Sequence, residues 1–222
     1  MSAETRQYRK KARAEQEAET RRRITESAVA LHEKLGPGRT PMSAVAEHAG
    51  VRRSTLYRHF PDEAALFEAC TSHWLADNPP PDLAAWAAIE DPDERLRTAL
   101  EDLYAYYGRT ERMTSNLYRD EDTNDNVRHH FSVFRGFLAA VRDILMQGRG
   151  LRGNAKRRTQ ATIGHSLDFL TWRSLVREQG LSDEEAVELA CGLVSGAGRA
   201  NGAQSSSAAS DASTSSRSSS AA

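Results

Sequence analysis

The chain has 222 residues, of which 39% are hydrophobic, and its 30 Lys and Arg nearly balance its 31 Asp and Glu. This length fits one large domain, or a small domain followed by a medium one. No run approaches the roughly 18 apolar residues of a membrane span, and no basic-then-apolar signal peptide is recognisable; we therefore expect a cytoplasmic protein with no membrane partner.

Positive charge is concentrated at the N-terminal side of the chain. Residues 1 to 63 contain thirteen Lys and Arg against nine Asp and Glu, a net of +4, which leaves −5 for the remainder. Residues 1 to about 20 have no sustained apolar face and are expected to form a flexible or loosely helical basic arm. Such an arm either reaches the DNA backbone or minor groove, or stays a solvated tail.

A first helix is expected from Arg21 to Leu35, because apolar residues recur there at helical spacing. The helix should end at the breaker Gly36-Pro37-Gly38. The apolar stripe consists of Ile24, Ala28, Leu31 and Leu35.

Residues 40 to 63 predict two short helices separated by a tight turn. Gly50 follows the apolar stripe of the first helix, at a place where a left-handed turn residue is needed. The second helix keeps Leu56 and Phe60 on an apolar face and leaves a cationic, hydroxyl-rich face free. These parts are those of a helix-turn-helix, whose second helix lies in the DNA major groove. The apolar stripe before Gly50 consists of Met42, Val45, Ala46 and Ala49.

The segment resembles the recognition helix and following turn of the tetracycline-repressor (TetR) family. The resemblance rests on Gly50-Val51, the short polar run after it, and the sequence Leu-Tyr-Arg-His-Phe-Pro-Asp from 56 to 62. It is strong over about residues 21–77, and beyond them it concerns only size and helical pattern. Glu63 departs from the family, because members often carry there a lysine that meets a DNA phosphate.

The resemblance implies a sequence-specific DNA-binding transcriptional regulator with a pseudo-palindromic operator. Arg52 or Arg53 would read guanine edges, Arg58 could read bases or bind phosphates, and the hydroxyl and imidazole groups would bind phosphates. The residues expected at the DNA are Thr40, Ser43, Arg52, Arg53, Ser54, Thr55, Tyr57, Arg58 and His59.

The rest of the chain also reads as helical, and no run alternates with period two, so we expect an all-α fold. Helices are expected at about 61–77, 93–108, 110–119, 124–147, 155–178 and 182–198, which makes about nine in all. The organisation expected is a basic arm (1–20), an N-terminal three-helix helix-turn-helix domain (21–77, motif about 43–62), a C-terminal helical ligand-binding and dimerisation domain (78–199) and a disordered Ser/Ala-rich tail (200–222).

The segment 155–178 is apolar on two opposite faces if it is one helix, so both faces must be covered. One face would pack against the chain's own second domain, and the other would pack against a second copy of the chain. This agrees with the homodimer that the resemblance implies. The alternative is a central core helix in a monomer. The residues assigned to the dimer interface are Ile163, Leu167, Leu170, Ser174, Ala186, Leu189, Ala190, Leu193, Val194 and Ala197.

A small-molecule effector is expected between the helices of the second domain, where ligand sites are mostly apolar with few polar groups. The aromatic residues of this domain are expected to be core residues in the first place, and some of them could line the effector pocket. The candidate pocket residues are Tyr104, Tyr107, Tyr118, His130, Phe131, Phe134, Arg135, His165, Phe169 and Trp172. No cofactor and no metal site are expected. Cys70 and Cys191 are isolated thiols, expected to be reduced core residues.

The function predicted is therefore a repressor that a small molecule releases from DNA, and not an enzyme. The alternatives are a helical ligand-binding protein or enzyme that keeps the helix-turn-helix only as scaffold, and a helical adaptor with a protein partner. The string Gly148-Arg-Gly150-Leu-Arg-Gly153 matches a dinucleotide fingerprint, but it follows a helical pattern and not a strand. We interpret it as a turn between helices.

Overall fold

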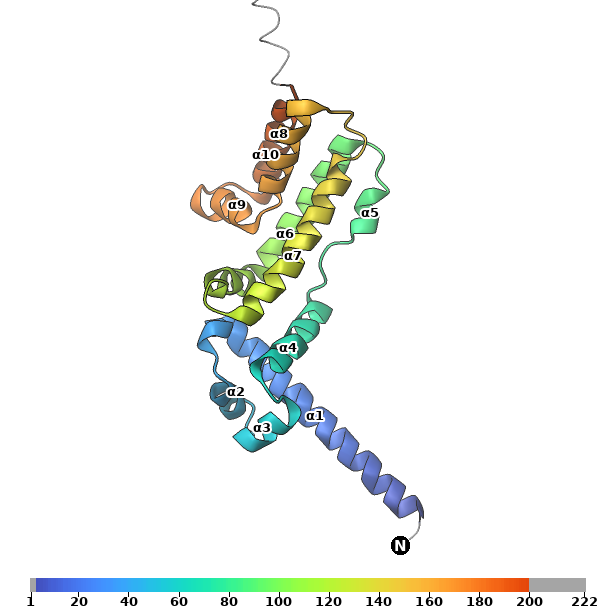
Figure 1. The fold of residues 1–222 in the computed structure, drawn as a ribbon, viewed down its shortest axis with the longest axis vertical. Helices are drawn as coiled ribbons and strands as arrows, with labels where there is room; N and C mark the ends of the chain where they lie inside the picture. Colours follow the sequence, from blue (N-terminus) through green and yellow to red (C-terminus); the bar gives the residue numbers. More distant parts are fainter. Residues whose placement is uncertain (1–2, 200–222) are drawn as a thin grey trace, which may run out of the picture. The chain divides into compact units, whose positions relative to one another are not determined.

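The computed structural model describes residues 3–199, with side chains from Arg6 onwards (Figure 1). Over these residues the fold is all-helical and contains no strand, which confirms the predicted fold class. The expected disordered tail, residues 200–222, lies outside the described residues. The elements are α1 (Ala3–Leu35), η1 (Pro37–Arg39), α2 (Met42–His48), α3 (Arg53–His59), α4 (Glu63–Asp77), α5 (Leu83–Ala87), α6 (Pro92–Asp120), α7 (Asp125–Met146), α8 (Gly153–Ser166), α9 (Phe169–Arg173), η2 (Ser174–Glu178) and α10 (Asp183–Arg199).

The described residues form two compact units. The first contains residues 3–80 together with 108–135, and the second contains residues 81–107 together with 136–199. The first unit therefore includes the end of α6 and the start of α7 in addition to the segment 21–77.

In the first unit, α1 packs against α2 and α4, and α2 packs against α3 (Figure 1). The core is built by the apolar stripes that the sequence shows, because a short amphipathic helix buries its stripe only by packing it against neighbouring helices. It consists of Ile24, Ala28, Met42, Val45, Ala46, Ala49, Leu56, Phe60, Leu66 and Cys70.

The N-terminal stretch expected to be a flexible or loosely helical arm is helical from Ala3 and continuous with α1. Its side chains from Arg6 to Glu19 are exposed, so no burial accounts for the helix. Ion pairs at helical spacing join Lys11 to Glu15 and Arg13 to Glu17. Such pairs contribute about 0.2–0.5 kcal/mol each to an isolated helix, which favours the helical form over an unstructured arm.

Two other segments differ from their predicted boundaries. The pieces expected at 93–108 and 110–119 are one helix, α6, since Gly108 does not interrupt it. The segment expected to be one helix over 155–178 breaks after Ser166. Asp168 caps the new helix α9 by accepting a hydrogen bond from the backbone N–H of Leu170 at 2.7 Å. The two-faced pattern of 155–178 therefore does not belong to a single helix.

In the second unit, α8 and α10 pack against each other. Tyr104 and Tyr107 of α6 are fully buried, and their hydroxyls donate to the backbone carbonyls of Ser166 and Leu167. These bonds hold the end of α8 on α6 and satisfy polar groups that would be costly to bury alone.

Candidate DNA-binding surface and ligand cavity

The turn between α2 and α3 has the geometry that the sequence predicts. Gly50 has a φ of 64°, in the left-handed region. Its N–H donates to the carbonyl of Glu47 at 3.0 Å, and the N–H of Val51 donates to the carbonyl of Ala46 at 2.9 Å. This pair of bonds is a Schellman motif, which ends a helix and turns the chain sharply. The turn fixes the direction in which α3 leaves α2.

The polar residues of α3 lie on one side because Leu56 and Phe60 are fully buried on the other. Arg52, at the N-cap, and Tyr57, which is 46% exposed, belong to the same outward side. We call the exposed residues the α3 surface: Arg52, Arg53, Ser54, Tyr57 and Arg58. Thr55 and His59 are half-buried at its border. The structure thus brings seven of the nine predicted DNA-binding residues to α3 and its N-cap.

The last turn of α3 is held by Arg21 of α1. The Arg21 guanidinium donates to the backbone carbonyl of His59 at 2.7 Å and lies 4.1 Å from the centroid of the Phe60 ring. The hydrogen bond satisfies a carbonyl at a helix C-terminus, and the ring contact is a cation–π interaction. Arg21 therefore positions α3 from the neighbouring helix.

The other two predicted contact residues precede or begin α2. Ser43 is half-buried. Thr40 is 8% exposed, and its hydroxyl donates to the carbonyl of Gly36 at 2.7 Å. The Thr40 hydroxyl therefore holds the turn before α2. Glu63, the departure from the family pattern, is exposed in the first turn of α4, next to the N-cap Asp62.

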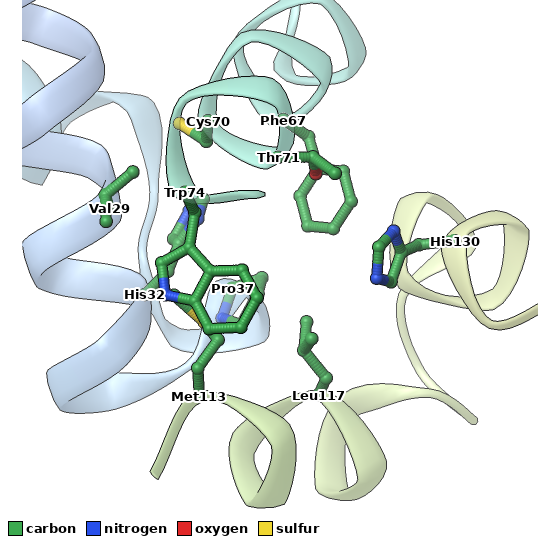
Figure 2. A pocket seen from close by; sticks show the side chains of 10 residues that line it. All are labelled: Val29, His32, Pro37, Phe67, Cys70, Thr71, Trp74, Met113, Leu117 and His130. Carbon is green, nitrogen blue, oxygen red and sulfur yellow. The ribbon is translucent and has the colours of Figure 1, made fainter. Parts of the chain in front are cut away.

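A cavity lies among α1, η1, α4, α6 and α7, entirely within the first unit (Figure 2). The volume of the cavity is about 30 Å³, and it is partly open to solvent. That volume is far below the range of about 300–1,000 Å³ for ligand pockets. The lining residues are Val29, His32, Pro37, Phe67, Cys70, Thr71, Trp74, Met113, Leu117 and His130.

The titratable groups of the cavity are held in their neutral forms by burial. Burial lowers the pKa of His32 to about 4, although the carboxylate of Asp120 acts in the opposite direction. Burial also lowers the pKa of His130, with a smaller contribution from the neighbouring His129. The pKa of the Cys70 thiol is raised to about 12 for the same reason. Near neutral pH the cavity therefore presents two uncharged imidazoles and an unreactive thiol.

The end of α6 caps the C-terminus of α1 beside this cavity. The Asn116 side-chain amide donates to the carbonyls of His32 and Glu33, at 3.1 and 2.8 Å, and Arg119 donates to the carbonyl of Leu35 at 2.7 Å. These are among the last four carbonyls of α1, which no residue within the helix can satisfy. We call Asn116, Arg119 and Asp120 the α6 clamp.

The α6 clamp also holds the turn that follows α1. Oδ2 of Asp120 accepts a hydrogen bond from the N–H of Gly38 at 2.9 Å, and Arg119 pairs with Asp120 at the same distance. Gly36 has a φ of 91°, and a Cβ built on it would collide with Arg119 and Asp120. Glycine is thus required there by both conformation and space.

Of the ten residues predicted for an effector pocket, the structure places only His130 in the lining of this cavity. Tyr104, Tyr107, Phe169 and Trp172 are fully buried and packed against one another as core. The other five lie elsewhere: Tyr118, Phe131 and Phe134 form an aromatic cluster, Arg135 pairs with Glu121 at 2.6 Å, and His165 is exposed.

Sequence reasoning missed most of the cavity because its residues had been assigned to helix stripes. Trp74 and Cys70 lie in the helix expected at about 61–77. A position that lines a cavity cannot be told from a core position by periodicity alone. One usable signal was His32, a titratable side chain beside the apolar stripe of α1. It is 7% exposed in the structure.

The residues predicted for a dimer interface divide into two groups. Ile163, Leu167, Ala186, Ala190 and Val194 are buried within the chain itself. Leu170, Leu189 and Leu193 are 44%, 43% and 52% exposed, while Ser174 and Ala197 are half-buried. The buried residues belong to α8, its C-cap and α10, and α8 and α10 pack against each other. The exposed leucines remain available to a partner.

Residues 24–70 match the family model for bacterial regulatory proteins of the tetR family. The matched segment spans the C-terminal part of α1, the helix-turn-helix and the first half of α4, and so includes the α3 surface. A comparison with curated protein sequences finds no match. Within residues 24–70, the match and the fold agree on a helix-turn-helix DNA-binding domain of the kind found in bacterial regulatory proteins of the tetR family.

Solved structures with the same fold extend over most of the chain. A TetR-like transcriptional regulator from Rhodococcus sp. RHA1 is 20% identical, with a TM-score of 0.58, and the match covers 80% of this chain and 94% of that one. NalD of Pseudomonas aeruginosa, the secondary repressor of the MexAB-OprM multidrug efflux pump, is 19% identical, with a TM-score of 0.53 and coverages of 81% and 95%.

AibR, solved in complex with isovaleryl coenzyme A and operator DNA, is 16% identical, with a TM-score of 0.57 and coverages of 78% and 97%. The chain has the fold of the TetR-family transcriptional regulators, and the resemblance inferred from residues 40 to 63 is confirmed. Within the described residues, no helix has both the length and the apolar character to cross a membrane.

Proposed function

We propose that the chain acts in the cytoplasm as a homodimeric repressor that binds a pseudo-palindromic operator and is released from it by a small molecule. The observation that carries this proposal is the α3 surface. Three arginines, Arg52, Arg53 and Arg58, are exposed there beside Ser54 and Tyr57, while the apolar residues of the same helix are fully buried. An arginine guanidinium can donate two hydrogen bonds to the edge of a guanine, and hydroxyl groups can donate hydrogen bonds to phosphate oxygens.

The proposed homodimer forms through the outward side of α10. Leu189 and Leu193 are exposed one turn apart, and ideal Cβ atoms built on Gly192 and Gly196 meet no atom within 4 Å. Each glycine costs about 1 kcal/mol in a helix interior, which close approach of a second helix would offset. A symmetric dimer presents two α3 surfaces to two half-sites of an operator.

The proposed release involves the cavity and the α6 clamp. His32 and Pro37 line the cavity, and the carbonyl of His32 is also held by Asn116. A ligand that changes the packing of these residues would also shift the turn that leads into α2. Coupling between two such sites is typically about 1–3 kcal/mol.

The experiment that tests DNA binding is a titration of the full chain with the DNA upstream of its own gene, at two salt concentrations. Sequence-specific binding should weaken steeply with salt, with a slope set by the number of phosphates contacted. An equal-length random duplex is the control. Binding that ignores sequence, or no binding at low salt, would contradict the proposal.

A further inference from the structure

We infer that the N-terminal part of α1 is a second DNA-contacting element, a rigid helix that binds phosphates beyond those within reach of the α3 surface. Its contact residues, which we call the α1 stripe, are Arg6, Arg9, Lys10 and Arg13. The inference rests on the proposed function, because it requires the α3 surface to lie at a DNA duplex. It adds a contact with the phosphate backbone, which strengthens binding without reading the base sequence.

The α1 stripe lies on one side of the helix, because its members follow one another at intervals of three and four residues. α1 runs without a break from Ala3 to Leu35. Ile24 follows Arg6 by about five turns of 3.6 residues. Ala28 follows Lys10 by the same interval. Both Ile24 and Ala28 are fully buried in the core of the first unit. The stripe therefore continues, beyond the core, the side of α1 that packs against α2 and α4.

The same side of α1 adjoins the C-terminal end of α3. The Arg21 guanidinium donates to the carbonyl of His59 at 2.7 Å. Burial lowers the pKa of the His59 imidazole, and the carboxylate of Glu17, one turn before Arg21, acts in the opposite direction. From this contact α1 continues past α3 toward its own N-terminus (Figure 1). The α1 stripe therefore extends the α3 surface from the end of that helix.

On the opposite side of α1 the cations are neutralised within the helix. Lys11 pairs with Glu15 at 3.9 Å, and Arg22 pairs with Glu19 at 2.6 Å. At about 100° per residue, Lys11 and Arg22 lie roughly 140–160° around the helix from Arg6. This side of α1 therefore has no excess of positive charge to attract DNA.

The α1 stripe keeps most of its positive charge. Arg13 pairs with Glu17 at 3.2 Å. Arg6, Arg9 and Lys10 are exposed, and among the residues whose side chains the structure describes they have no ion-pair partner. Like charges three and four residues apart destabilise an isolated helix. A row of phosphates would relieve this repulsion, so the chemistry of the stripe fits a polyanion.

The dimensions of the helix decide which part of a duplex it meets. A helix with its side chains is about 10–12 Å wide, whereas the minor groove is only about 6 Å wide, so α1 cannot enter that groove. From Arg21 to Arg6 the helix rises about 22 Å at 1.5 Å per residue. This length corresponds to several phosphates of one strand, which are spaced at about 3.4 Å along the duplex axis. The α1 stripe therefore binds the phosphate backbone and not the base edges.

The charge of the stripe is tested with two double variants of the full chain. Arg9→Gln/Lys10→Gln removes two cations of the stripe, and Lys11→Gln/Arg22→Gln removes two cations from the opposite side. Each variant is titrated with the duplex upstream of the gene and with a random duplex, over a series of salt concentrations. The stripe variant should make the slope of log K against log salt less steep by about 3–4, at about 0.9 per phosphate and two cations in each chain of a dimer.

Because phosphates carry no sequence information, the stripe variant should lower the affinity for both duplexes by the same factor. The variant of the opposite side should leave the slope unchanged. Equal slopes in the two variants, or an unchanged slope in the stripe variant, would overturn the inference. A loss confined to the upstream duplex would assign the stripe to base reading and would also contradict it.

The rigidity of the helix is tested by insertions that keep every charge. Two alanines between Ala14 and Glu15 rotate residues 3–14 by about 200° relative to the rest of α1, so the stripe turns away from the duplex. Four alanines rotate it by about 400°, which returns it to within about 40° of its own side. Alanine is the best helix former, and circular dichroism checks that helical content is retained. The first insertion should reduce the salt slope as the stripe variant does, and the second should restore most of it. Equal slopes for the two insertions would show a flexible arm and refute the helical contact.

The outcome for the proposed function is measured separately on the same samples. If the wild-type chain prefers the upstream duplex and the stripe variant keeps the wild-type salt slope, the proposed function stands and the inference fails. If the wild-type chain shows no preference between the duplexes but the stripe variant reduces the slope, the α1 stripe stands as a DNA contact and the sequence-specific function fails.

Discussion

The N–H of Gly38 donates to Oδ2 of Asp120 at 2.9 Å, although the two residues are 82 positions apart in the sequence. Asp120 ends α6, and Gly38 lies in the turn just before α2. The bond therefore connects a helix that contributes to the cavity with the segment that leads into the helix-turn-helix. Asp120 is 5% exposed, so its carboxylate is not free to exchange this partner for water.

We predict that Asp120→Ala weakens both stability and operator binding. The substitution leaves the partly buried N–H of Gly38 and the guanidinium of Arg119 without the carboxylate, at a cost of about 1–3 kcal/mol in the free energy of unfolding. Urea denaturation and operator titration measure the two effects. Asp122→Ala, at an exposed position two residues away, is the control. Unchanged operator affinity in a variant with reduced stability would mean that the clamp serves folding alone.

The helix-turn-helix could be predicted from sequence because its signals are local. The stripe before Gly50 and the polar run after it are contiguous in the sequence. The left-handed turn between them is indicated by a single glycine, Gly50. The α6 clamp could not be predicted in this way. Asn116 and Arg119 look like ordinary polar residues of a helix surface, and only the fold brings them to the end of α1.

The cavity and the outward side of α10 were only partly predictable for a related reason. His32, Trp74, Met113 and His130 come from four helices, and periodicity shows that a residue is covered without showing by what. In α10 the residues predicted for the dimer interface include both the buried Ala190 and the exposed Leu193. Sequence alone could not separate the buried residues from the exposed ones, because their burial depends on where α8 packs.

Arg53→Ala should relax sequence specificity without abolishing affinity for DNA. If Arg53 reads a base edge, its loss costs about 1–3 kcal/mol on the operator, or roughly 5- to 150-fold in Kd, and much less on a random duplex. Competition titrations of operator against random DNA at fixed salt measure the ratio. Tyr57→Phe removes a proposed phosphate contact and is the comparison, since it should weaken both duplexes alike. An equal loss on both duplexes for Arg53→Ala would assign this arginine to a phosphate.

Leu193→Glu should convert the proposed dimer to a monomer. Leu193 is 52% exposed in the single chain, so a glutamate is tolerated there by the monomer but would be buried without a partner in a helix–helix interface. Light scattering coupled to size exclusion measures the mass, and operator titration measures the loss of paired half-site binding. Val133→Glu, which alters a residue 62% exposed on α7, is the matched control. A dimer that survives Leu193→Glu would place the interface elsewhere.

We predict that the folded chain loses stability in mild acid, because the imidazole of His32 is buried. Its pKa is about 4 in the folded chain, below the ordinary value of 6.5, because burial disfavours the charged form. Between these values the unfolded chain binds a proton that the folded chain does not, so the free energy of unfolding falls as the pH drops from 6.5 toward 4. For a shift of this size, the loss between pH 7 and pH 5 is about 2 kcal/mol from His32.

Urea denaturation at pH 7 and pH 5 measures this dependence. His32→Gln, which replaces the imidazole by a group that does not titrate, should reduce the difference between the two pH values by about 2 kcal/mol. His48→Gln, at an exposed position of α2, should leave it unchanged. His130 contributes in the same direction, because burial lowers its pKa as well, so a residual dependence is expected in His32→Gln. A full wild-type dependence in that variant would show that His32 is not the buried neutral group that the structure describes.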